Sequence, residues 1–127
     1  MRVSVLPILS VLVLATPTLA INFDDVIVDD SNKPVCEVVL KDSETCPSDK
    51  ILTVGKAARN SLYFLGQDEQ NTSGDERYHR GEFAARLKGV VEDLKSEEIV
   101  LIKTRVGKVY PPMVVKRVWD AVEAPKK

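Results

Sequence analysis

Two adjacent prolines near the C-terminal end constrain the fold of this chain more than any other feature. Pro111 and Pro112 stand between two amphipathic stretches in RVGKVYPPMVVKRVWDAV. Proline lacks a backbone N–H and disfavours helical geometry in the residue before it, yet it is well tolerated at the first position of a helix. The sequence therefore predicts one helix that ends near Tyr110 and another that begins at Pro111 or Pro112 and folds back on the first.

A helix and a polar loop are predicted further upstream. Thr53 is a good N-cap for the stretch 54–65, in which apolar residues recur at three- and four-residue steps, and Gly66 is placed to stop it. The polar run that follows contains Asn71 in the tripeptide Asn-Thr-Ser, which is a glycosylation sequon. Asn71 is therefore a modification site only if the source of the chain glycosylates its exported proteins.

Two more helices are predicted between this loop and the proline corner. Ser73 and Glu76 have the S-x-x-E spacing of a capping box before the stretch 74–89, where Gly89 is expected to end the helix. Ser96 is expected to cap the next helix, which has acidic residues in its first turn and an apolar stripe along one face. The residues predicted to form the core are Leu62, Leu65, Phe83, Leu87, Ile99, Ile102, Val106, Val115, Val118 and Trp119.

The first twenty residues, MRVSVLPILSVLVLATPTLA, have the order of a secretory signal peptide. A single arginine precedes an apolar run, and Thr18 and Ala20 stand at the small-residue positions of a cleavage site. The run is shorter than the roughly 20 apolar residues that span a bilayer. No stable membrane span is therefore expected after cleavage, although a retained N-terminal anchor is an alternative. Cleavage after Ala20 would leave 107 of the 127 residues, one small domain exported to the periplasm or the medium.

The only two cysteines, Cys36 and Cys46, stand in CEVVLKDSETC. An even number of cysteines in an exported chain predicts a disulfide. The sequence has neither a C-x-x-C motif for redox catalysis nor a second Cys/His pair for zinc. The pair is therefore predicted to be structural, with a contribution on the order of 2–3 kcal/mol to stability.

The segment 21–50 is predicted to form a small β-hairpin. A short β-branched run, a cluster of turn residues and a possible return strand follow one another in it, and such a hairpin must pack on something larger to be stable. The predicted fold class is α+β, mostly helical, with about four short helices and a small N-terminal hairpin stapled by a disulfide. The predicted organisation is a signal peptide (1–20), the hairpin segment (21–50), a helical domain (51–123) and a tail (124–127).

Three blocks of residues 50–123 resemble a family of small uncharacterised proteins from phage, prophage and bacterial genomes. They are ILTVGKAARNSL, DEQNTSGDERYHRGEFAARL and SEEIVLIKTRVGKVYPPMVVKRVWDAVE, which match a T-x-G helix start, a D-E-x-x-x-S-G-E block, an E-E-x-x-x-I-K-x-x-x-G-K-x-Y-x-P-x-V-V block and a C-terminal W-D. This chain departs from the pattern in its signal peptide and in Asp75-Glu76-Arg77, where the family has Glu-Glu-Lys. The family has no known activity, so the resemblance implies a shared fold and no catalytic residues.

Charge is distributed unevenly along the chain. After cleavage it would carry 17 basic and 19 acidic residues, a net charge of −2, which argues against nucleic-acid binding. Residues 103–127 carry a net charge of +5 and residues 21–102 a net charge of −7. The basic end either attracts a partner or pairs with the acidic hairpin within the molecule, and we favour the second interpretation.

The sequence lacks a recognisable catalytic constellation. His79, the only histidine, is more typical of a half-exposed surface residue than of a general base, and no G-x-S-x-G or phosphate-binding loop is present. We expect no cofactor and favour a non-enzymatic protein. The alternative is a small enzyme or an inhibitor-like effector, with the candidate residues Arg77, Arg80, Tyr110, Lys116 and Arg117.

A second alternative is calcium or anion binding by the acidic segment Asp24–Asn32. Asp24, Asp25, Asp29 and Asp30 supply the oxygen ligands that calcium prefers. The segment does not match the D-x-[DN]-x-[DN]-G pattern of a calcium loop, however, and it lacks the closing glutamate. Solvent-facing acidic residues around a turn are therefore the favoured interpretation.

Export, small size and uneven charge together favour a module that binds another protein. The predicted contact residues belong to the basic C-terminal part of the chain, and the partner is unknown. They are Arg105, Lys108, Tyr110, Lys116 and Arg117.

Overall fold

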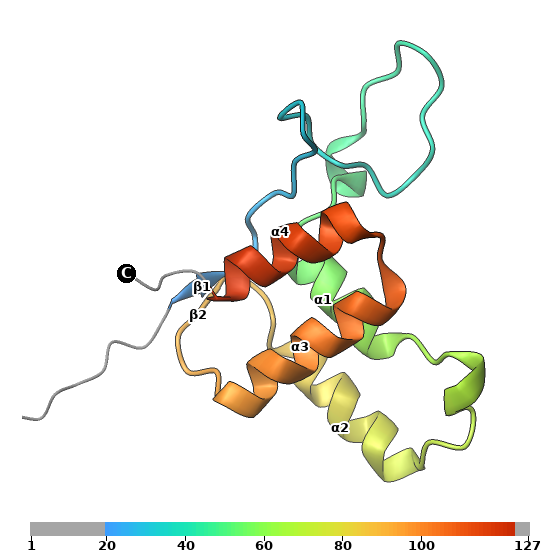
Figure 1. The fold of residues 1–127 in the computed structure, drawn as a ribbon, viewed down its shortest axis with the longest axis vertical. Coiled ribbons are helices and arrows are strands. Elements are labelled where there is room, and N and C mark those ends of the chain that lie inside the picture. Colours follow the sequence, from blue (N-terminus) through green and yellow to red (C-terminus); the bar gives the residue numbers. More distant parts are fainter. Residues whose placement is uncertain (1–19, 124–127) are drawn as a thin grey trace, which may run out of the picture.

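Four helices make up most of the structure. The computed structural model describes residues 20–123, so the signal peptide and the tail predicted at 1–20 and 124–127 lie almost wholly outside the described residues. The helices are α1 (Val54–Tyr63), α2 (Gly74–Ala85), α3 (Ser96–Val109) and α4 (Pro112–Glu123), with 3₁₀ turns η1 (Ser48–Lys50) and η2 (Gln67–Glu69). α1 is central and packs against the other three helices, and α3 also packs against α4 (Figure 1).

The proline corner has the predicted form. α3 ends at Val109, and Tyr110 follows with the extended dihedral angles φ −109° and ψ 157°. The N–H of Tyr110 still donates to the carbonyl of Val106 at 3.0 Å, and the N–H of Val115 donates to the carbonyl of Pro111 at 3.1 Å. The corner therefore ends one helix and starts the next, and it turns α4 back along α3.

The hairpin predicted for the N-terminal segment is present, and a third extended segment, which contains Leu52, hydrogen-bonds to it. Val28 and Pro34 form an antiparallel bridge, and the N–H of Val35 donates to the carbonyl of Ile27 at 2.9 Å. The N–H of Leu52 in turn donates to Val35 at 2.8 Å and its carbonyl accepts from Ile27 at 3.0 Å. The fold class is therefore α+β and mostly helical, as predicted.

Cys36 and Cys46 form the predicted disulfide, with their Cα atoms 5.8 Å apart. The loop that they close extends away from the helices (Figure 1). Val39, near its middle, is 98% exposed. The disulfide therefore fixes a protruding loop beside the hairpin.

One pair of short strands joins distant parts of the chain. β1 (Ile21–Asn22) pairs antiparallel with β2 (Val90–Val91), and Ile21 lies opposite Val91. Gly89 precedes β2 with a positive φ of 61°, which glycine adopts readily. The prediction that Gly89 ends α2 is wrong, because α2 already ends at Ala85 and Gly89 shapes the turn into β2.

The core lies between the helices and the N-terminal segment. Leu62, Leu87 and Ile102 are buried as predicted, together with Phe83, Val106 and Val118. Leu65, Ile99 and Val115 are only partly buried. Phe23 and Ile27 are fully buried although the sequence did not mark them as core, so the N-terminal segment is part of the packed interior.

The prediction that Trp119 is buried in the core is wrong. α4 packs through Val114, Val118 and Val122, which recur every four residues and therefore lie along one face. Trp119 is one position away from that face and remains 38% exposed. Its Nε1–H donates to the carbonyl of Lys103 at 3.2 Å, and the Lys103 ammonium lies 4.5 Å from the centre of the indole ring. Trp119 therefore covers the edge of the α3–α4 contact.

The helix caps agree with the sequence at two of three positions. The Thr53 hydroxyl accepts from the N–H of Lys56, and the Ser73 hydroxyl accepts from the N–H of Glu76, both at 3.1 Å. Ser96, however, is the first residue of α3 and not its cap. The Glu98 carboxylate instead accepts from the N–H of Lys95 at 3.0 Å. α1 ends at Tyr63, before Gly66, which begins the turn η2.

Candidate functional site: the groove between α2 and α3

An open groove of about 590 Å³ lies between α2 and α3. Both helices pack on α1 and make little direct contact with each other. Within α2 and α3, the lining residues recur at i, i+3, i+4 and i+7, the spacing of one helix face. They are Glu76, His79, Arg80 and Phe83 on α2, and Leu101, Thr104, Arg105 and Lys108 on α3, joined by Glu69, Glu97 and Glu98.

The two helices run in opposite directions along the groove. Arg86, just after α2, pairs with Glu98 in the first turn of α3 at 3.0 Å. Nearer the opposite end, Glu69 lies between Arg80 of α2 and Arg105 of α3. Phe83 and Leu101 supply apolar surface between these charged ends. Along α3 the groove therefore has an acidic end at Glu97 and Glu98, an apolar middle, and a basic end at Arg105 and Lys108. Glu69 and, on α2, Glu76 also lie at this basic end.

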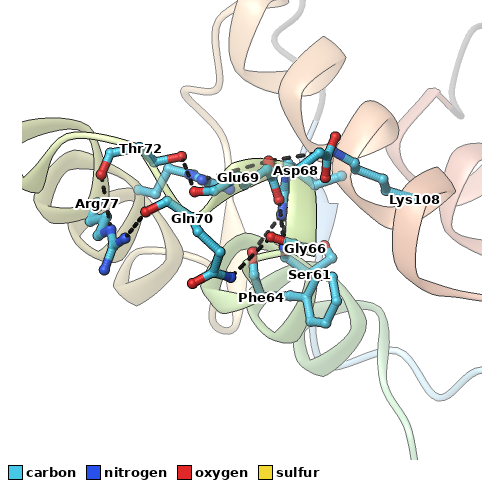
Figure 2. A network of polar contacts seen from close by, with 11 residues as sticks. Ser61, Phe64, Gly66, Asp68, Glu69, Gln70, Thr72, Arg77 and Lys108 are labelled. Atoms are coloured by element: carbon cyan, nitrogen blue, oxygen red, sulfur yellow. Dashed lines mark hydrogen bonds and ion pairs between the residues drawn. The ribbon is translucent and has the colours of Figure 1, made fainter.

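Glu69 is the centre of a polar network at the basic end (Figure 2). Its carboxylate accepts from the N–H of Gly66 at 2.9 Å and from the Arg105 guanidinium. It also lies 3.4 Å from the Lys108 ammonium and 3.8 Å from an Arg80 nitrogen. One carboxylate thus joins the α1–α2 loop to both walls of the groove.

The network keeps Glu69 ionised over the whole physiological range. The hydrogen bond from Arg105 and the one from the N–H of Gly66 lower the pKa of the Glu69 carboxyl to about 2. Hydrogen bonds to the charged form of a carboxylate favour that form, and a nearby positive charge acts in the same direction. Glu69 is therefore a fixed negative charge and is unsuited to proton transfer near neutral pH.

Arg105 was predicted to contact a partner, and the structure corrects this assignment. Arg105 is only 4% exposed. Its Nε–H donates to the carbonyl of Ser61 at 3.1 Å, one terminal nitrogen donates to the carbonyl of Phe64 at 2.6 Å, and the other binds Glu69. All the nitrogen atoms of this guanidinium have partners within the molecule, so Arg105 fixes the α1–α2 loop to α3.

Arg80 differs from Arg105 in how its charge is satisfied. It is 7% exposed, and its Nη1 has no hydrogen-bond partner among the described residues. Its only ion-pair partner in that part of the chain is Glu69, at 3.8 Å, which is longer than a hydrogen bond. Buried cations are normally paired and hydrogen-bonded, so Arg80 is the exceptional residue of this site.

The other predicted contact residues are divided between two places. Tyr110 accepts a hydrogen bond from the Asn60 side chain at 3.1 Å, and burial raises the pKa of its hydroxyl. Lys116 pairs with Asp120 on its own helix at 2.7 Å, while Arg117 lies 3.7 Å from Asp30. Lys116 and Arg117 line one hollow and Tyr110 lines another, so the structure does not bring the three side chains of the enzyme alternative together. Lys108 alone of the five lies in the groove in exposed form.

The acidic hairpin pairs with a basic helix, which is the interpretation that the charge distribution favoured. Arg117 donates to the carbonyl of Asp29 at 3.4 Å in addition to its pair with Asp30. The Asp29 carboxylate accepts from the N–H groups of Ser31 and Lys33, at 2.8 and 3.0 Å. The hydrogen bond from Lys33 and, to a smaller extent, the one from Ser31 lower the pKa of the Asp29 carboxyl. Asp29 therefore serves the hairpin turn.

Asp24 and Asp25 also have local partners. Asp24 accepts from the N–H of Gly89 at 3.3 Å, and Asp25 accepts from the Asn22 side chain at 3.1 Å. Within residues 20–123, no three His, Cys, Asp or Glu side chains lie close enough together to hold a metal ion. The calcium alternative therefore has no geometric support in this part of the chain.

His79 lines the groove as an exposed residue. Its ring nitrogens lie 3.6 Å from the carboxylates of Asp75 and Glu82, on the same helix face, and its ring stands edge-on to Tyr78 at 5.6 Å. The structure brings no serine or cysteine nucleophile to it among the residues that line the groove. His79 is therefore part of the polar rim.

The disulfide indicates an oxidising compartment outside the reducing cytoplasm. In the described range 20–123, none of the helices has the length and apolar character needed to cross a membrane.

The chain matches no protein-family model, no curated protein and no solved structure. The geometry of its own residues therefore carries the functional argument.

Sequence reasoning missed the two residues that define the groove. Glu69 lies in a stretch that reads only as a polar loop, and Arg80 was considered only as a surface residue of the enzyme alternative. A signal for Arg80 was present, since it lies three residues before Phe83 and so shares its helix face. No local pattern signals Glu69, because its partners Arg80, Arg105 and Lys108 belong to other elements.

Proposed function

We propose that the protein is an exported, non-enzymatic binding module whose α2–α3 groove takes an amphipathic helix from a partner protein. The observation that carries this proposal is the groove itself, in which two helix faces oppose each other without packing together. A helix laid between them would contact α2 and α3 and rest on the apolar surface of Phe83 and Leu101. Helix-in-groove binding of this kind is a recurring mode of peptide recognition.

The charges of α3 favour one direction for the bound helix. Glu97 and Glu98 lie in its first turn and Lys108 in its last turn, all on the groove. A partner helix with acidic residues in its first turn and basic residues in its last turn pairs with both ends when it runs antiparallel to α3. The expected occupant is therefore an amphipathic helix with this charge order and an apolar stripe in its middle.

Export is the second part of the proposal. It is supported by the N-terminal sequence and by the disulfide, which persists outside the reducing cytoplasm. We expect the protein in the periplasm or the medium with Ile21 as its first residue, as measured by intact mass after fractionation. A full-length mass in the membrane fraction would instead show a retained anchor.

Site-specific photo-crosslinking tests the groove. A photoreactive amino acid at Thr104, an exposed groove position, is compared with one at Lys116, an exposed position on α4. We expect one discrete adduct from position 104 and none from 116, with the crosslink mapped to an amphipathic helix of the predicted charge order. Lys108→Glu should abolish it.

Other adducts would decide against the proposal in different ways. An adduct between two copies of this chain would identify a homodimer in place of a partner protein. The same adduct from positions 104 and 116, or none from 104, would exclude the groove as the binding surface.

A further inference from the structure

We infer that the basic end of the groove is an anion site, in which Arg80 binds a carboxylate carried by the bound segment. This inference rests on the proposed function and specifies the chemistry at one end of the same groove. It depends on a separate observation, namely that the guanidinium of Arg80 is buried and that its Nη1 has no hydrogen-bond partner within residues 20–123.

The unpaired nitrogen is unusual because the neighbouring cations are satisfied. Arg105 donates to two backbone carbonyls and to Glu69, and Lys108 lies within 3.5 Å of both Asp68 and Glu69. Arg80 has only a 3.8 Å ion pair with Glu69, and its Nη1 has no partner among residues 20–123. A buried donor without a partner is energetically unfavourable, so a ligand oxygen that reached it would recover that free energy.

Glu69 cannot fill this position itself. Its carboxylate already accepts from Gly66 and Arg105 and faces Lys108, which holds it on the loop side of the groove. The cluster contains three cations, Arg80, Arg105 and Lys108, around the partly buried carboxylate of Glu69, and Asp68 lies 3.5 Å from Lys108. Arg105 and Lys108 are thus paired, so a further negative charge is favoured at Arg80 itself, with the Thr104 side chain on the same groove.

The lining of the whole groove favours a monoanion over a dianion. Against the three cations stand four carboxylates, Glu69, Glu76, Glu97 and Glu98, and Asp68 adds another beside Lys108. These carboxylates would repel a doubly charged phosphate more strongly than a single carboxylate. The one negative charge of a carboxylate is enough to pair with the Arg80 guanidinium. The structure therefore favours an acidic side chain or a chain-terminal carboxylate of the bound segment. Nη1 is covered in the free protein, so Arg80 must change rotamer to reach it, as interface side chains commonly do.

A small amphiphilic acid can serve as the probe. 4-Phenylbutanoate offers a carboxylate for Arg80 and a ring for the surface of Phe83 and Leu101, and its amide has the same shape without the charge. Binding to the mature chain is followed by amide chemical shifts. We expect saturable shifts around Arg80 and Thr104 with the acid, and an affinity at least about tenfold weaker for the amide.

Variants assign this preference to Arg80. Arg80→Met should weaken acid binding about tenfold and remove the preference over the amide, whereas Arg117→Met, which changes an arginine elsewhere on the molecule, should leave both unchanged. Equal binding of acid and amide by the wild type, or an unchanged affinity in Arg80→Met, would overturn the anion site. Inorganic phosphate binding as tightly as the acid would overturn the assignment to a carboxylate.

Thermal unfolding of Arg80→Met separates a binding role from a structural one. If the Arg80 guanidinium serves to bind a ligand, folding should not depend on it. We therefore expect an unchanged or raised melting temperature for Arg80→Met. A fall of several degrees would show that Arg80 mainly holds the fold together, and would overturn the inference. If acid and amide bind the groove equally well, docking of a helix survives while the anion site fails, so the two proposals fail separately.

Discussion

Besides α1, on which it packs, α3 has two neighbouring helices, α2 and α4, and it meets them in opposite ways. On the side that packs on α1 and α4 it has Ile102 and Val106, which are fully buried in the core. Toward α2 it presents Leu101, Thr104, Arg105 and Lys108, and the space between the helices stays open. One helix therefore has a closed side and an open side, set by residues that are adjacent in the sequence.

The difference shows what keeps a groove open in a small helical protein. Apolar faces close because packing removes them from water. Charged residues on facing helices need hydrogen-bond partners or solvent, and full closure would bury them without enough partners. The open side has only Phe83 and Leu101 to draw it together, and Glu69 links the two helices at one end without closing the gap.

The largest expected effect on stability is the difference between substitutions on the two sides of α3. Ile102→Ala should lower the free energy of unfolding by about 2–5 kcal/mol, because it leaves a cavity in a fully buried position. Leu101→Ala, one residue away on the open side, should lower it by about 1 kcal/mol or less. Denaturant unfolding of both variants measures the contrast. Equal losses would mean that α2 closes on α3 in solution.

Removing the disulfide tests whether the protruding loop supports either side of α3. Replacing Cys36 and Cys46 by alanine should lower the free energy of unfolding by about 2–3 kcal/mol through the entropy of the unfolded chain. Groove binding of the 4-phenylbutanoate probe should not change, since neither cysteine lines the groove. A weaker probe affinity in the folded variant would contradict this separation.

Trp119 tests the edge of the closed side. Trp119→Ala should lower the free energy of unfolding by about 1–2 kcal/mol, less than for a core tryptophan, because the residue is 38% exposed and loses mainly its contact with Lys103. Trp119→Phe, which keeps an aromatic ring over the same lysine, should recover part of the loss. A cost above about 3 kcal/mol would place Trp119 in the core after all.

The last expected effect depends on pH and concerns the basic end of the open side. The folded pKa of Glu69, about 2, lies below its ordinary value of 4.5. Its contribution is therefore fully present above pH 4.5 and is lost as the pH falls towards 2. Unfolding experiments across this window should show wild-type stability falling more steeply than that of Glu69→Gln. Parallel curves would contradict a low pKa for Glu69.

Much of the fold was predictable because its signals are local. Apolar periodicity located all four helices, the proline pair fixed the corner, and Thr53 and Ser73 marked two helix starts. The turn residues of the hairpin and the cysteine pair were equally clear. Each of these features depends on residues that are close together in the sequence.

Features that depend on distant residues were not predictable in the same way. Periodicity shows that α4 has an apolar face, but it does not show how the helix is rotated about its axis. Trp119 was therefore assigned to the interior, whereas Val114 and Val122 fill it. The pairing of β1 with β2 joins two-residue strands, which are too short to carry a pattern. The groove itself arises because two helices do not pack together, so no single segment of the sequence contains a signal for it.

The contacts of the N-terminal segment have a consequence for the order of folding. Ile21 pairs with Val91, and Asp29 accepts from Arg117, 88 positions later in the chain. These two contacts form only when residues far along the chain are available, whereas Phe23, Asp25 and Ile27 hydrogen-bond to residues 52–55. We expect the N-terminal segment to assemble first with the start of α1 and its contacts with Val91 and Arg117 to form last, because closing so long a loop must wait for the surface that rewards it.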